Sequence, residues 1–188
     1  AQGRARRDGE QQRLLLVLGA GVQDRGGGQR RGREEGRAQE IASHFLEHDT
    51  QLAIAEACAA IAQHEFVAVD TEFLRETTYW PMLCLIQAAA GEVEILIDPM
   101  IEGLSLDPFL ELMANEKVLK VFHAPRQDLE IFYRLMAGKL PSPVFDTQTA
   151  AMALGLGEQI AYDGLVMALL KRPVDKSHRF TDWSRRPL

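Results

Sequence analysis

Apolar residues follow two different patterns between about residue 50 and residue 170 of this chain. In some segments they return every three or four residues, which is the period of one face of a helix. In others they form short continuous runs bounded by turn residues, which is typical of buried strands. The runs predict strands over residues 66–70, 82–88, 93–97, 118–122 and 144–146. The helical period predicts helices over about residues 49–62, 105–113, 126–136, 147–155 and 162–170.

The order of these elements predicts an α/β fold with a mixed sheet. The connections between the first three strands are short, which favours antiparallel pairing. The later strands alternate with helices, which is the arrangement that gives parallel pairing. We therefore expect three antiparallel strands followed by parallel strands, flanked by helices, rather than a fully parallel, doubly wound sheet.

The first 40 residues differ from the rest of the chain in composition and charge. They contain nine arginines, six acidic residues and nine of the 15 glycines, whereas the net charge of the whole chain is −6. Such a segment buries too little apolar surface to offset the entropy lost on ordering. We expect residues 1–45 to form a dispensable, disordered extension to one domain at residues 46–188. An RGG-like tail that binds RNA is the alternative.

Composition also narrows the class of protein. No apolar run approaches the roughly 20 residues that a membrane-spanning helix needs. Two cysteines, Cys58 and Cys84, are too few for a disulfide framework, so we expect a cytoplasmic protein. The acidic balance after residue 40 excludes a basic footprint covering the whole domain. An acidic domain can still act on a polyanion if metal ions neutralise its carboxylates.

Asp70 and Glu72 are the first candidate site residues. Asp70 follows an apolar run, so we expect it at the carboxyl end of a buried strand, and strand alternation turns Glu72 to the same side. Two neighbouring carboxylates repel each other in a partly dry cleft. A divalent cation removes that conflict, and a ligand set made only of oxygen favours Mg²⁺ or Mn²⁺. A solvated turn at the end of the strand is the alternative.

Asp128 is the third candidate carboxylate. Ile131, Phe132 and Leu135 follow it at three, four and seven residues, which places Asp128 on the inward apolar face of the predicted helix. A carboxylate facing the sheet is costly unless it is paired or binds a metal. The alternative is an aspartate favoured by the helix dipole in the first turn. If the preceding strand pairs beside residues 66–70, all three carboxylates meet at one strand end, as in two-metal sites.

Four longer segments carry a resemblance to a known family. They read VAVDTEFLRETTYWPMLCLIQ, VLKVFHAPRQDLEIF, VFDTQTAAMALG and DKSHRFTDWSRRPL, and they span about residues 49–188. They resemble the nuclease domain of the bacterial ribonuclease D family, which belongs to the DEDD 3′→5′ exonucleases. The resemblance implies a ribonuclease H-like fold and two-metal hydrolysis that releases nucleoside 5′-monophosphates from RNA 3′ ends, including tRNA precursors. It assigns Asp70 and Glu72 to the first exonuclease motif and Asp128 to the second.

The third motif of this family branch, Tyr-x-x-x-Asp, does not occur in the chain. Tyr79, Tyr133 and Tyr162 are the three tyrosines, and none has an aspartate four residues later. In the family, the tyrosine orients the attacking water and the aspartate completes the metal site. We therefore expect a nuclease domain that is truncated before its third motif, and we expect the 188-residue chain not to degrade RNA on its own.

His123 and Asp128 offer a second interpretation. Their spacing matches His-x4-Asp, which is the third motif of the histidine branch of the same superfamily. That branch needs its second-motif aspartate between Glu72 and His123, where only Asp98 and Asp107 occur. Both precede prolines in a turn or at a helix start, so we interpret His123 as a strand-end residue that lines the cleft or is hydrogen-bonded near it.

Six residues are weaker candidates for contacting nucleic acid, through aromatic stacking on bases or through charge on phosphates. They are Phe73, Tyr79, Trp80, His123, Arg179 and Arg185. The leading hypothesis is a metal-dependent 3′→5′ exoribonuclease acting on RNA 3′ ends. The alternatives are a 3′→5′ exonuclease acting on DNA and a catalytically inactive RNA-binding module of the same fold.

Overall fold

The structure is a computed structural model that describes residues 51–75, 79–174 and 182–186. The proposed extension at residues 1–45, the first two residues of the helix expected over about residues 49–62, and Arg179 lie outside the described residues.

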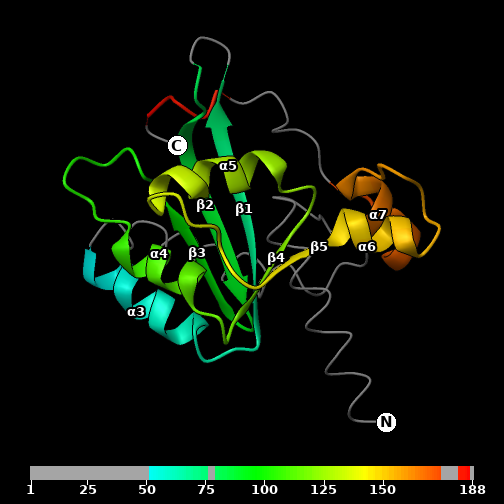
Figure 1. Cartoon of the computed structure of the whole chain (residues 1–188), viewed down its shortest axis with the longest axis horizontal. Coiled ribbons are helices and arrows are strands. Elements are labelled where there is room, and N and C mark those ends of the chain that lie inside the picture. Colours follow the sequence, from blue (N-terminus) through cyan, green and yellow to red (C-terminus); the bar gives the residue numbers. More distant parts are fainter. Residues whose placement is uncertain (1–50, 76–78, 175–181, 187–188) are drawn as a thin grey trace, which may run out of the picture.

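Five strands form one mixed sheet in the order β3-β2-β1-β4-β5 (Figure 1). Strands β1, β2 and β3 pair antiparallel, while β4 pairs parallel to β1 and β5 pairs parallel to β4. The predicted α/β class, with three antiparallel strands followed by parallel strands, is therefore confirmed. The strands are β1 (Phe66–Leu74), β2 (Met82–Ala90), β3 (Val93–Ile97), β4 (Leu119–Phe122) and β5 (Val144–Asp146).

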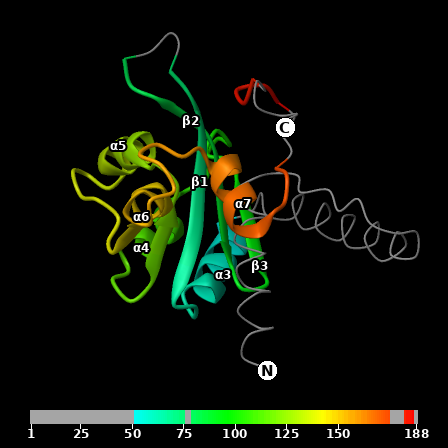
Figure 2. The same ribbon diagram turned by 90° about the vertical axis from the view of Figure 1, so that its right-hand side faces the viewer.

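Five helices flank the sheet within the described ranges. Figure 1 shows α6 and α7 beyond β5, and Figure 2 shows the same pair from the side on which they project. None of the described helices is long and apolar enough to cross a membrane. The helices are α3 (Gln51–Ile61), α4 (Asp107–Ala114), α5 (Arg126–Leu135), α6 (Thr147–Ala153) and α7 (Tyr162–Leu170).

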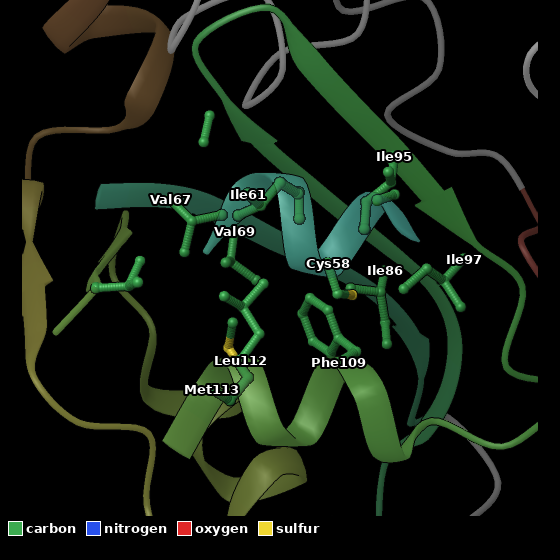
Figure 3. Close-up of a cluster of buried hydrophobic side chains, with 14 of the residues drawn as sticks. Cys58, Ile61, Val67, Val69, Ile86, Ile95, Ile97, Phe109, Leu112 and Met113 are labelled. Atoms are coloured by element: carbon green, nitrogen blue, oxygen red, sulfur yellow. The ribbon is translucent and has the colours of Figure 1, made fainter. Parts of the chain in front are cut away.

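The main core lies between the sheet and helices α3, α4 and α5. Val67 and Val69 of β1 point toward Phe109 and Met113 of α4, and α3 adds Cys58 to the same cluster (Figure 3). Alternate residues of a strand share one face, so the next residue of β1 on this core face is Thr71. Burial raises the pKa of Cys58 to about 12, so its thiol stays protonated and packs as a small apolar group.

Strand β1 extends further than the sequence predicted. The apolar run stops at Asp70, yet β1 continues to Leu74 because β2 goes on pairing beside it, with Glu72 opposite Leu85. The expectation that Asp70 ends the strand is therefore wrong. The register shifts between Glu72 and Phe73, which marks a β-bulge just after the second carboxylate.

Helix α5 follows the predicted helical pattern for most of its length. Ile131 and Phe132 are buried on the inward face, as predicted. Leu135 was expected on the same face but is 39% exposed. It is the last residue of α5, so no further turn of the helix covers it.

Lys120 is a buried charged residue that the apolar pattern of β4 does not predict. Its side chain is fully buried. The ammonium group donates to the backbone oxygens of Asn115, Val118 and Ser142 at 2.5, 2.8 and 2.6 Å. Three acceptors match the three protons of a lysine ammonium, so the buried donor is satisfied. These bonds join the start of β4 to the loop before β5.

Candidate active site

The two carboxylates of the first motif lie within β1. Asp70 is opposite Gln87 of β2, and Glu72 is two residues further along. On the other edge of β1, pairing with β4 stops at Ala68, opposite Val121. Asp70 and Glu72 share one face of the strand. They therefore lie on a stretch of β1 that is paired on one edge only within the described sheet.

Asp128 reaches the same stretch of β1 from the first turn of α5. Its side chain is only 8% exposed. Its Oδ1 accepts a hydrogen bond of 2.5 Å from Oγ1 of Thr71, the residue between the two carboxylates of the first motif. The prediction that Asp128 faces inward is confirmed. The contact brings together two motifs that are 57 residues apart in the sequence.

The three carboxyl groups influence one another electrostatically. Burial, together with the charges of Asp128 and Glu72, raises the pKa of Asp70 to about 8. Burial and the charge of Asp128 also raise the pKa of Glu72. Burial raises the pKa of Asp128, although the hydrogen bond from Thr71 opposes that rise. In the described ranges none of the three is paired with a lysine or arginine. Hydrogen bonds from Thr71 offset part of the cost of ionising Asp70 and Asp128, but no lysine or arginine of the described residues offsets the rest.

A divalent cation would remove that cost. Carboxylate oxygens are the ligands that Mg²⁺ and Mn²⁺ prefer, so the chemistry of this donor set fits either ion. Among the residues that the structure describes, no three His, Cys, Asp or Glu side chains are close enough together to hold one ion. The three carboxylates are therefore close enough to repel one another but do not converge on one point, and their joint ligation of a metal stays a prediction.

His123 lies directly after β4, and both of its ring nitrogens are hydrogen-bonded. Nε2 is 3.1 Å from the backbone oxygen of Ile160, and Nδ1 is 2.9 Å from Oγ1 of Thr147. Because a carbonyl oxygen can only accept, we assign the ring proton to Nε2. Burial lowers the pKa of His123, which favours this neutral form. The hydroxyl of Thr147 also donates to the backbone oxygen of Phe122 at 3.0 Å, so its one proton is shared between that oxygen and Nδ1. Nε2 is therefore the nitrogen that is occupied by its bond to Ile160 in this arrangement.

Tyr162, at the start of α7, completes this side of the site. Its ring packs edge-on against His123 with the ring centroids 5.6 Å apart. Burial and then the charge of Asp70 raise the pKa of Tyr162, so the phenol is within electrostatic reach of the first carboxylate. In the sequence, Tyr162 attracts attention only as one of three tyrosines that could begin the third motif, and no short-range pattern relates it to Asp70.

Two residues near the ends of β1 and β2, Arg75 and Trp80, contact α5. Arg75 donates to both carboxylate oxygens of Glu130, at 3.0 and 3.3 Å. The Arg134 guanidinium lies 4.6 Å from the centre of the Trp80 ring, and the rings of Trp80 and Tyr79 are 4.9 Å apart. Tyr79 is 83% exposed and Trp80 is 43% exposed. Both aromatic candidates for base stacking therefore reach the surface.

The remaining candidates are less closely tied to the carboxylates. Phe73 is half-buried in β1, and Arg185 is exposed and paired with Asp182. Asp98, which the histidine-branch interpretation would need, accepts hydrogen bonds from Arg186 instead. Asp107 is exposed in the first turn of α4. Neither aspartate accompanies His123, so this geometry gives the histidine-branch interpretation no support.

Comparisons with known proteins agree with the motifs. The family model described as 3′-5′ exonuclease matches residues 46–188. Ribonuclease D of Sphingobium indicum is 60% identical over 136 residues, covering 72% of this chain and 35% of the relative. Ribonuclease D of Nitrobacter hamburgensis is 55% identical over 139 residues, covering 74% and 36%.

A solved structure shows the same fold. The crystal structure of Escherichia coli RNase D, described as an exoribonuclease involved in structured RNA processing, superposes with a TM-score of 0.68 at 37% identity. The match covers 72% of this chain and 36% of that one. The chain thus spans about a third of the length of these relatives. It belongs to the family of 3′-5′ exonuclease domains, and the resemblance to ribonuclease D that its motifs predicted is confirmed.

Proposed function

We propose that residues 46–188 form the nuclease domain of a 3′→5′ exoribonuclease that uses two divalent metal ions, Mg²⁺ or Mn²⁺. The observation that carries the proposal is that Asp128 is hydrogen-bonded to Thr71, between Asp70 and Glu72, and that, after burial, its charge raises the pKa of both of these acids. Three interacting carboxylates without a cationic partner are costly unless cations bind there. High identity to proteins named ribonuclease D supports RNA as the substrate.

The residues of the chain have distinct parts in this proposal. Asp70, Glu72 and Asp128 hold the ions, and His123 and Tyr162 form the neighbouring wall. Tyr79 and Trp80 offer ring faces to the 3′-terminal bases. Bound metal ions of this kind activate a water molecule and stabilise the leaving oxygen. The products are then nucleoside 5′-monophosphates.

The substrates and the compartment are also proposals. The description of the Escherichia coli relative as acting in structured RNA processing supports structured RNA 3′ ends, and the resemblance points to tRNA precursors among them. Two free, buried cysteines suit a reducing cytoplasm.

The proposal is tested with RNA labelled at its 5′ end. A 3′→5′ exonuclease shortens such an RNA stepwise in Mg²⁺ or Mn²⁺, and not in EDTA. A matched single-stranded DNA in the same tube distinguishes RNA from DNA specificity. Release of labelled 5′-monophosphate from a uniformly labelled RNA identifies the product. The protein assayed is a version of the chain extended through a Tyr-x-x-x-Asp segment. Internal cuts by this extended version, or binding without shortening under every metal condition, would contradict the proposal.

The expected dependence on a third motif needs its own comparison. The 188-residue chain is assayed beside a version extended through a Tyr-x-x-x-Asp segment. Only the extended version is expected to shorten RNA, because the three carboxylates leave one metal ion short of a ligand. Equal rates would place the fourth ligand within residues 1–188.

Replacing Tyr79 and Trp80 together with Ala is expected to weaken binding of single-stranded RNA. Stacking of a base on an aromatic ring contributes about 1–3 kcal/mol, so the dissociation constant is expected to rise about tenfold or more. Fluorescence anisotropy with a labelled oligonucleotide in EDTA measures binding without cleavage. Tyr133→Ala is the matched control, because it removes an exposed ring from α5. If both variants bind like the wild type, these two aromatics do not contact RNA.

A further inference from the structure

Thr71 occupies an unusual position between the two carboxylates of the first motif. As the middle residue of Asp70-Thr71-Glu72 it faces the opposite side of β1 from both acids. Its hydroxyl donates to Oδ1 of Asp128 at 2.5 Å. Thr71 is 6% exposed, and Asp128 is also buried, so water does not compete for this bond. A residue of the first motif thus binds the carboxylate of the second motif directly.

The position of the Thr71 hydroxyl is fixed by its surroundings. Thr71 pairs with Ile86 of β2 and continues the core face formed by Val67 and Val69. A β-branched side chain in a strand has few accessible rotamers. The hydroxyl therefore presents its proton to Asp128 from a rigid part of the sheet.

The contact is not needed simply to attach α5 to the sheet. The ion pair of Arg75 with Glu130 and the packing of Trp80 on Arg134 already join residues next to β1 and β2 to α5. Phe132 anchors the same helix in the core. The hydrogen bond from Thr71 adds to these contacts by orienting the carboxylate group of Asp128.

We propose that Thr71 is a positioning residue that orients Asp128 for binding a divalent cation. This inference rests on the metal site proposed above. Partners that hydrogen-bond to metal ligands commonly change metal affinity 10- to 100-fold when they are removed. Thr71 would therefore set how tightly the site holds its metal without touching the ion.

Binding of Mn²⁺ alone to the 188-residue chain tests the inference, because it needs no turnover. Free Mn²⁺ is measured by its electron paramagnetic resonance signal during titration. Thr71→Val keeps the shape of the side chain but removes the hydroxyl, and about tenfold weaker binding is expected. Thr71→Ser keeps the hydroxyl and is expected to bind within about threefold of the wild type. This rescue distinguishes orientation of Asp128 from packing of the threonine methyl group.

Thr149→Val is the matched control. Thr149 also donates its hydroxyl to an aspartate, at 2.7 Å from Oδ2 of Asp146, but this bond is exposed and lies at the start of α6, where Asp146 is the N-cap. The control is expected to bind Mn²⁺ like the wild type. If the Thr71→Val variant lacks the far-ultraviolet circular dichroism of the wild type, Thr71→Ala replaces it in the comparison.

The double variant Asp70→Asn, Glu72→Gln separates the inference from the proposed function. If the wild type binds Mn²⁺ no better than this double variant, the metal site itself is overturned, and the inference falls with it. If the wild type binds and the double variant does not, yet Thr71→Val binds as tightly as the wild type, only the role of Thr71 is overturned.

Discussion

Without metal, the free energy of unfolding of this chain is expected to fall as the pH rises from about 5 to about 8. The folded protein holds the pKa of Asp70 at about 8, against 3.8 for an ordinary aspartate, chiefly because the group is buried. Between these two values the folded chain keeps a proton that the unfolded chain has lost. The stabilisation is therefore present at low pH and disappears as the pH rises through the folded-state pKa. The expected slope approaches about 1.4 kcal/mol per pH unit for one such group.

Urea unfolding in EDTA at several pH values measures this dependence. Asp70→Asn is expected to remove most of it and to make the chain more stable than the wild type at about pH 8, since an amide has no proton to lose. Glu102→Gln, which neutralises an exposed carboxylate in a surface turn, is the control and should leave the slope unchanged. A wild-type chain that gains stability over this range would contradict the expectation.

Bound metal should oppose this fall in the free energy of unfolding with rising pH. A cation at Asp70 favours the ionised carboxylate, so saturating Mn²⁺ is expected to stabilise the wild type most near pH 8 and little near pH 5. Asp70→Asn should lose this metal-dependent stabilisation. The wild type and Asp70→Asn together thus measure how much stability the unpaired carboxylates cost at high pH and how much of it the metal restores.

Much of the fold followed from local sequence patterns. The strand at residues 93–97 and the helix from Arg126 agree with the structure because an apolar run and a helical period are local properties. The end of β1 did not follow, because the pairing of Glu72 with Leu85 depends on a second strand rather than on the residues around Glu72. Leu135 was misplaced because the helical period does not show where the packing surface ends.

Some residues of the candidate site could likewise be predicted from the sequence, and others could not. Asp70, Glu72 and Asp128 stood out because acids on apolar faces are conspicuous in a sequence. Thr71 did not, since a threonine in a strand is ordinary and its partner is 57 residues away. Tyr162 is further still from Asp70 along the chain, and only the placement of α7 brings its phenol within electrostatic reach of Asp70. Local sequence patterns do not identify polar residues whose hydrogen-bond or electrostatic partners are distant in the sequence.

Phe132→Ala is expected to destabilise the chain by about 3–5 kcal/mol. Phe132 is fully buried, with its ring 6.0 Å from Phe109 of α4 and 6.1 Å from Phe122 of β4, measured between centroids. Removing the ring leaves a cavity where two helices meet the sheet. Thermal and urea unfolding measure the loss. Tyr133→Ala removes an exposed ring from the next position and should change stability by only about 0.5 kcal/mol.

Phe132→Ala should also affect the proposed metal site. Phe132 lies one helical turn after Asp128 on the inward face of α5, so it sets how closely the start of the helix approaches β1. Phe132→Ala is therefore expected to weaken Mn²⁺ binding even at temperatures where the variant stays folded, whereas Tyr133→Ala should not. If Phe132→Ala loses stability but keeps full Mn²⁺ affinity, Asp128 is held by Thr71 alone and not by the seating of α5. Thr71→Val should lose affinity with a much smaller loss of stability, and this contrast separates orientation of one carboxylate from placement of the whole helix.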